Sequence, residues 1–103
     1  MTRVWIYETD DRAAIRMEGH AEYDKTGRDI VCAACSVLIQ SLINTLQLLG
    51  TPNSWKQDDG KVGLSFSKEK EENREKALGA FNMCKVGLEM LAASYPQNVT
   101  IMK

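Results

Sequence analysis

The chain has 103 residues, a length that suits one domain with a modest hydrophobic core. Apolar residues make up 44% and charged residues 26%, which are ordinary values for a globular protein. The net charge of −1 creates no basic field to attract nucleic acid or anionic lipid. Composition therefore argues against a protein that wraps RNA, and we expect no direct nucleic-acid binding.

The cysteine count and the hydropathy of the chain indicate in which cellular compartment the protein works. The three cysteines are an odd number, and they do not form a disulfide framework. The N-terminal stretch MTRVWIYETDD is charged and alternating, unlike a signal peptide. The longest apolar region, residues 30–49, contains six polar residues, which argues against a membrane helix. We therefore expect a reduced, cytoplasmic protein that contacts no membrane.

The N-terminal region predicts a β-hairpin. Residues 3–9 alternate and are rich in β-branched and aromatic side chains, and residues 12–19 resume the pattern after a turn at Asp10-Asp11. His20 would then lie at the exit of the second strand. Residues 21–28 are polar and contain one glycine, so we predict a loop there.

A long helix is predicted over residues 30–49. Asp29 is a suitable N-cap, because its carboxylate can accept the unpaired N–H groups of the first turn. Gly50 and Pro52 mark the C-terminal end. The polar side chains form one narrow strip: Ser36, Gln40, Asn44 and Gln47. The remaining arc is apolar and so wide that one side should cover the sheet while the other meets a second helix or a partner chain.

A second hairpin is predicted from residues 54–59 and 61–67, which flank an Asp-Gly turn signal. Polar residues follow Trp55, so the first of these strands is expected at a sheet edge. The charged residues 68–74 predict the solvated first turns of a second helix, which continues to about Ser94.

One face of the second helix is apolar, with residues at helical spacing: Ala77, Phe81, Cys84, Leu88 and Leu91. Residues 98–102 predict a last strand. The resulting order, ββαββα(β), has hairpins in place of βαβ alternation. We therefore predict a single α+β domain over residues 1–103, with two layers: a mostly antiparallel sheet and two helices on one of its faces.

The predicted helices separate the three thiols. Cys35 and Cys84 fall on apolar faces and are interpreted as small core hydrophobes. Cys32 lies at the border of the polar strip, where it can meet solvent, and near a helix start, which favours an anion. Asp29 places an opposing negative charge in the same turn. The alternative interpretation is that Cys32 is a third buried, inert cysteine.

His20 is the only histidine, twelve positions before Cys32, and a loop could bring the two together. Imidazole within hydrogen-bond reach of a thiol can take its proton, as a Cys–His nucleophile pair requires. A histidine at a strand end is also commonplace, although Gly19 and Ala21 leave room for another backbone to approach. No metal or other cofactor is expected, because one histidine and one solvent-facing cysteine do not make a tetrahedral site. A CxxC redox site is disfavoured, since Cys35 points into the core.

The segment GHAEYDKTGRDIVCAACS, residues 19–36, has a distinctive order: G-H-A, five residues, then G-x-D-I-V-C-A-A-x-S. It resembles the ribosomal-processing cysteine protease family (Prp, the YsxB-like proteins). The resemblance implies that His20 and Cys32 are the catalytic dyad. Cys35 is a departure, because relatives more often carry valine or another small apolar residue there.

The same resemblance implies supporting residues around the dyad. Asp29 matches the family aspartate and Ser36 the family serine, and Asp29 could orient the histidine as well as cap the helix. Gly27 matches the glycine that gives the family loop its mobility. We therefore predict that residues 21–28 are mobile in the free protein and order on substrate binding, with Tyr23 as a latch over an aromatic substrate residue.

The function implied by the resemblance is that of a cytoplasmic, homodimeric cysteine endopeptidase without a cofactor. Its substrate would be the N-terminal extension of bacterial large-subunit ribosomal protein twenty-seven, which family members remove after a pair of aromatic residues. Backbone N–H groups at the start of the first helix are candidates for an oxyanion hole. Two alternatives stay open: a non-catalytic ribosome-associated interaction module, and a different Cys–His enzyme such as a small acyl hydrolase.

Overall fold

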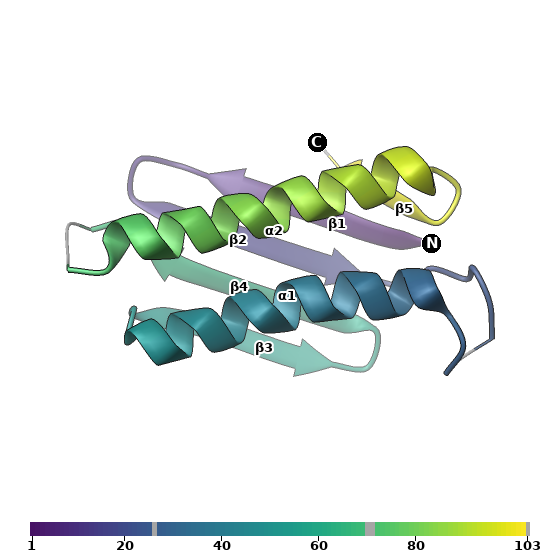
Figure 1. Ribbon diagram of the computed structural model, residues 1–103, viewed down its shortest axis with the longest axis horizontal. Helices are drawn as coiled ribbons and strands as arrows, with labels where there is room; N and C mark the ends of the chain where they lie inside the picture. Colours follow the sequence, from purple (N-terminus) through teal and green to yellow (C-terminus); the bar gives the residue numbers. More distant parts are fainter. Residues whose placement is uncertain (26, 70–71, 103) are drawn as a thin grey trace.

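The computed structural model describes residues 1–25, 27–69 and 72–102. Five strands form one sheet in the order β3-β4-β2-β1-β5. Two helices lie side by side on one face of this sheet (Figure 1). The predicted two-layer α+β architecture and the element order ββαββαβ are confirmed.

The sheet is mixed but mostly antiparallel. β1 (Thr2–Glu8) and β2 (Arg12–Glu18) form the first hairpin, and β3 (Asn53–Asp58) and β4 (Lys61–Ser67) form the second. β2 pairs with β4 and thereby joins the hairpins. β5 (Val99–Met102) runs parallel to β1, at the opposite edge from β3. The edge position predicted for the polar strand β3 is confirmed.

α1 covers Ile30–Leu49, the predicted range. The Asp29 carboxylate caps its first turn, and Gly50 ends it in the left-handed conformation with φ of 70°. By length and composition alone, this helix could cross a membrane. Its inward side chains, however, form part of the core that it shares with the sheet and the second helix. A core helix of this kind passes the same compositional test as a membrane span.

α2 (Arg74–Ser94) begins later than the charged run predicted, so the prediction of helical turns from residue 68 is wrong. The Lys68 N–H donates to the Asp11 carbonyl at 2.7 Å, which continues the pairing of β4 beyond its end. The Lys68 ammonium lies 3.1 Å from a Glu8 carboxylate oxygen. These two contacts hold residue 68 beside the β1–β2 turn, so the chain can start the helix only further on.

The core lies between the two layers. Its largest fully buried side chains come from strands and helices alike: Phe66, Phe81, Ile15, Ile39, Leu46, Leu88, Val4, Val31 and Val99. Phe66 of β4 and Phe81 of α2 pack edge to face, with ring centroids 5.8 Å apart. Such a pair stabilises a fold by about 1 kcal/mol beyond its area burial, and here it fixes α2 on the sheet.

One end of the molecule gathers segments that are far apart in sequence. The start of α1, the end of α2, the chain N-terminus and β5 all lie at the same end in Figure 1. β2 also ends there, because its last residue Glu18 pairs with Arg3 near the start of β1. The segment between β2 and α1, which carries the family-like motif, therefore crosses this end of the fold.

Candidate active site

His20 lies two residues after the end of β2 and is exposed. Gly19, just before it, has φ of 91°, and its N–H donates to the Gly60 carbonyl at 2.7 Å. A Cβ at position 19 would collide with the Met1 carbonyl oxygen, which confirms that another backbone approaches here. A Cβ added at Gly60 would lie 3.6 Å from His20 Nε2, so the imidazole lies over the β3–β4 turn.

The three free thiols differ in exposure as predicted. Cys35 and Cys84 are 3% and 2% exposed, whereas Cys32, the third residue of α1, is only partly buried. Burial raises the pKa of the Cys35 thiol to about 11 and that of the Cys84 thiol to about 12, and neighbouring charges add to both shifts. Both remain protonated at neutral pH, so Cys32 is the thiol with access to solvent and to chemistry.

The Asp29 carboxylate connects the loop to the helix. Its Oδ1 accepts the N–H groups of Val31 and Cys32, both at 2.9 Å. Its Oδ2 accepts the N–H groups of Tyr23 at 2.9 Å and Asp24 at 3.3 Å. Burial by itself would raise the pKa of Asp29, but these backbone hydrogen bonds and a contact with the Cys32 thiol lower it below its ordinary value. Asp29 therefore caps the helix as predicted, and within the described residues the imidazole is not among its partners.

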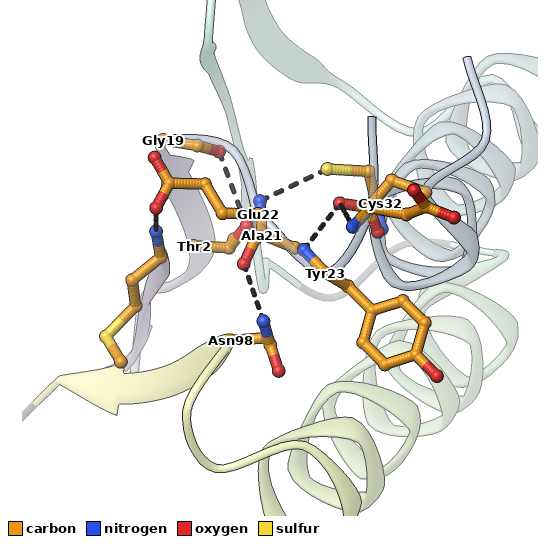
Figure 2. Close-up of polar contacts among 10 residues, drawn as sticks. Thr2, Gly19, Ala21, Glu22, Tyr23, Cys32 and Asn98 are labelled. Carbon is orange, nitrogen blue, oxygen red and sulfur yellow. Dashed lines mark hydrogen bonds and ion pairs between the residues drawn. The ribbon is translucent and has the colours of Figure 1, made fainter. Parts of the chain in front are cut away.

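The backbone N–H groups around Cys32 have partners within the protein. Asp29 occupies the N–H groups of Val31 and Cys32, so the expectation that the helix start supplies free oxyanion donors is wrong at these two positions. The group that faces the sulfur is the Ala21 N–H, which donates to Cys32 Sγ at 3.2 Å (Figure 2). The backbone of the loop that follows β2 therefore contacts the thiol.

Two hollows share three lining residues: His20, Cys32 and Ser36. One, of about 220 Å³, extends toward the β3–β4 turn, where Gln57 and Gly60 contribute to its wall. The other, of about 470 Å³, extends along the loop, and its further lining is Glu22, Asp24, Gly27, Asp29 and Ala33. The structure thus brings together the predicted histidine, cysteine, serine and aspartate at the start of α1.

Tyr23 packs away from these hollows. Its ring meets the ring of Tyr95, at the end of α2, edge to face, with centroids 5.3 Å apart. Gly27 has φ of 88°, a conformation that favours glycine, and Thr26 lies outside the described residues. The proposed movement of residues 21–28, with Tyr23 as latch, stays a prediction.

Three contributors to the site have no clear signal in the sequence. Ala21 contributes its backbone N–H to the sulfur, and Gly60 lies beneath the imidazole. The Asn98 side chain donates from Nδ2 to the Ala21 carbonyl at 2.9 Å, across 77 positions of sequence. Ala21 belongs to the G-H-A motif and Gly60 to the predicted turn, but backbone contacts and contacts over such a separation depend on the packed fold, so no local pattern predicts these roles.

Other parts of the described structure offer weaker sites for this chemistry. A third hollow, of about 550 Å³, lies on the face of the sheet opposite the helices, and its lining includes no thiol or imidazole. Within residues 1–25, 27–69 and 72–102, no three His, Cys, Asp or Glu side chains are grouped to hold a metal ion. The partly buried Cys32 thiol and the His20 imidazole both line the two smaller hollows.

The fold and this site define a class of protein: a small α+β domain that presents a solvent-accessible thiol and an imidazole in shared hollows, as thiol-dependent hydrolases do. A model of the cysteine protease Prp family matches residues 1–100. The chain belongs to the cysteine protease Prp family.

Solved structures share this fold over nearly the whole chain. The essential ribosomal processing protease Prp from S. aureus, in complex with a covalently linked product peptide, is 24% identical with a TM-score of 0.83, covering 98% of this chain and 97% of that one. The same S. aureus protease with a substrate peptide is 23% identical, with a TM-score of 0.78 and coverage of 99% and 98%. SMU.848 from Streptococcus mutans is 27% identical, with a TM-score of 0.72 and coverage of 98% and 91%. No curated protein matches the chain by sequence.

Proposed function

We propose that the chain is a cysteine endopeptidase that removes the N-terminal extension of large-subunit ribosomal protein twenty-seven. Cys32 is the nucleophile and His20 the general acid and base. The observation that carries this proposal is that the accessible thiol and the only histidine line the same two hollows. The family and the S. aureus relatives, which bind substrate and product peptides and process a ribosomal component, support the substrate class.

The mechanism uses these two residues in turn. His20 takes the Cys32 proton, and the thiolate attacks the scissile carbonyl. The resulting tetrahedral species collapses to a thioester as the imidazolium protonates the leaving amine. Water activated by His20 then releases the N-terminal product and restores the thiol.

In the free protein the sulfur accepts the Ala21 N–H, and no hydrogen bond joins it to the imidazole within the part of the chain that the structure describes. Substrate binding must therefore bring the imidazole closer. Catalytic hydrogen bonds that are long in a free enzyme often shorten in the substrate complex. This supports a closing movement of residues 21–28, with Gly27 as the flexible point and Tyr23 exchanging its contact with Tyr95 for one with the substrate.

The two hollows support an endopeptidase. Cleavage within a chain requires space for residues on both sides of the scissile bond, and the dyad lies where the hollows meet. An extended peptide can occupy the hollow beside the β3–β4 turn and the hollow beside the loop, with its scissile carbonyl at Cys32. Asp29 and Ser36, which line the second hollow with the dyad, act as supporting residues.

We also propose a homodimer in the cytoplasm. Both helices expose large apolar side chains on the side away from the sheet: Ile30, Val37 and Leu48 of α1, and Met83, Val86 and Met90 of α2. Burial of this surface against a second copy would remove it from water, with a stabilisation of about 25 cal/mol per Å² of apolar area. Three free thiols support a reducing compartment, in which the ribosomal substrate is made.

The proposed function is tested with a synthetic peptide that carries the extension sequence and its aromatic pair. Mass spectrometry should show a single cut with the wild-type protein and none with Cys32→Ala. Tight binding without a cut would favour the non-catalytic interaction module. Hydrolysis of a small thioester or ester, with the peptide left intact, would favour a different acyl hydrolase.

A further inference from the structure

Ala21 is held from both sides of its backbone. Its N–H donates to Cys32 Sγ at 3.2 Å, and its carbonyl accepts the Asn98 side-chain amide at 2.9 Å (Figure 2). The residue is 0% exposed, so water does not compete for either bond. Two hydrogen bonds thus link Asn98, in the turn before β5, to Ala21 of the loop and Ala21 to the candidate nucleophile Cys32.

Asn98 is itself anchored through its own backbone. Its N–H donates to the Tyr95 carbonyl at 2.9 Å, and its carbonyl accepts the Thr2 N–H at 2.8 Å. These bonds join the end of α2 to the start of β1. The side-chain amide therefore extends from a rigid turn, and it can hold Ala21 at a defined distance from α1.

We infer that Asn98 is a positioning residue for the reaction, which acts on Cys32 and His20 through the backbone of Ala21. The inference rests on the proposed function, because it takes Cys32 as the nucleophile. The Ala21 N–H and the His20 carbonyl belong to one planar peptide unit. The orientation of that unit therefore sets both the direction of the N–H toward the sulfur and the direction of the backbone at His20. A hydrogen bond to sulfur also orients the thiol and stabilises negative charge on it.

A purely structural role for Asn98 is the alternative, and the chain offers a matched control. The Asn73 side chain makes the same kind of bond, from Nδ2 to the Leu49 carbonyl at 2.7 Å. It lies between the end of α1 and the start of α2, at the far end of α1 from Cys32. Loss of either amide removes one side chain–backbone hydrogen bond, but only Asn98 connects to the dyad.

The test compares Asn98→Leu, which keeps the shape of the side chain without its donor, with Asn73→Leu. Iodoacetamide alkylation of Cys32 is followed by mass spectrometry as a function of pH, and kcat and KM are measured on the extension peptide. Asn98→Leu should slow alkylation and lower kcat by up to about tenfold, the size expected when one hydrogen bond between neutral groups, here from the Asn98 amide to the Ala21 carbonyl, is lost. It should move the alkylation profile to higher pH and leave KM within about twofold, because substrate contacts are retained.

The titratable groups that line the two hollows with Cys32 are unchanged in Asn98→Leu, so a shifted profile reports the lost positioning. These groups are His20, Glu22, Asp24, Asp29, Cys35, Asp58 and Lys61. Asn73→Leu should lower the melting temperature while its alkylation profile and kcat match the wild type. Asn98→Ala serves as a second variant at position 98. Asn98→Leu and Asn98→Ala are both assayed as folded protein, below their melting temperatures.

Wild-type alkylation rate and pH profile in a folded Asn98 variant would overturn the inference, whatever its melting temperature. Equal changes in the Asn73 variant would also overturn it, because a general loss of stability would then explain both. Failure of the proposed function is recognised separately. A wild-type protein that cuts no peptide contradicts the protease, while the effect of Asn98 on Cys32 alkylation still decides whether the side chain positions the thiol.

Discussion

The backbone N–H of Ala21 donates to the sulfur of Cys32 at 3.2 Å, so the residue after the only histidine contacts the candidate nucleophile. The segment after β2, which carries the histidine, and the helix that carries the cysteine are thereby connected without a side chain–side chain bond. A substitution at either residue should therefore change the position of the other more than it changes the free energy of unfolding.

Cys32 should react first with an alkylating reagent. Its side chain is partly exposed, whereas burial holds the pKa values of Cys35 and Cys84 at about 11 and about 12. Since the thiolate is the nucleophile, iodoacetamide at neutral pH should label Cys32 almost alone in the folded protein. Peptide mapping of the adducts checks this. Preferential labelling of either buried thiol would contradict the assignment, and Cys84→Ser should retain cleavage while Cys32→Ala loses it.

His20→Ala should impair catalysis far more than folding. The imidazole is exposed at the strand exit, so its removal should change the free energy of unfolding by less than about 1 kcal/mol. Loss of general acid–base catalysis should lower the cleavage rate by about a hundredfold or more. Urea unfolding and peptide cleavage measure the two effects. A variant that unfolds readily, or that cleaves at the wild-type rate, would show that the histidine is structural.

Asp29 should make the fold acid-sensitive. Because the pKa of the folded carboxyl lies below its ordinary value of 3.8, its ionised form stabilises the fold above that pH. The contribution is lost as the pH falls through the lowered folded value. Asp29→Ala should cost about 1–2 kcal/mol at pH 7, since the helix loses its cap.

Asp29→Asn separates the charge from the cap. The amide oxygen can still accept N–H groups at the helix start, but the second acceptor and the ionisation are lost. Urea unfolding from pH 7 to about pH 2 should therefore show a smaller loss of stability in acid than the wild type. Asp58→Asn, at an exposed carboxylate that accepts one N–H, is the control. Equal acid sensitivity of Asp29→Asn and the wild type would refute the assignment.

The exposed apolar surface of the helices should form a dimer interface. Val37 of α1 and Met90 of α2 are 62% and 65% exposed, so a charge at either position should be tolerated in one subunit but not between two. Light scattering should give a dimer mass for the wild type at micromolar concentration and a monomer mass for Val37→Glu. A wild-type monomer would contradict the proposal.

The loop between the dyad residues should become ordered when substrate binds. Hydrogen exchange on Cys32→Ala, with and without the extension peptide, should show greater protection of the amides in residues 21–28 with peptide than without it. Tyr23 and Asp24 already donate to Asp29 in the free protein, so their amides should show the smallest change. Full protection without peptide, or none at saturating peptide, would exclude gating by this loop.

Local patterns in the sequence were sufficient for most of the fold. The alternation of β1, the Asp29 cap and the Gly50 end of α1 each depend on a few neighbouring residues, and the structure confirms all three. The helical wheel also separated Cys32 from the buried Cys35, because orientation on a helix follows from spacing alone. The start of α2 was misplaced, since Lys68 bonds to Asp11 and not to its own neighbours.

Only the tertiary structure decided how the site is assembled. Asp29 takes the helix N–H groups that could otherwise have faced a substrate, and the Ala21 N–H faces the sulfur in their place. Tyr23 rests on Tyr95, and the Asn98 amide reaches Ala21 across 77 positions. These contacts arise because the packing of α2 on the sheet and the pairing of β5 with β1 bring separate segments to one end of the molecule. Residue spacing along the chain carries no information about such a meeting. The motif therefore predicted which histidine and cysteine form the site, and the fold determined which residues surround them.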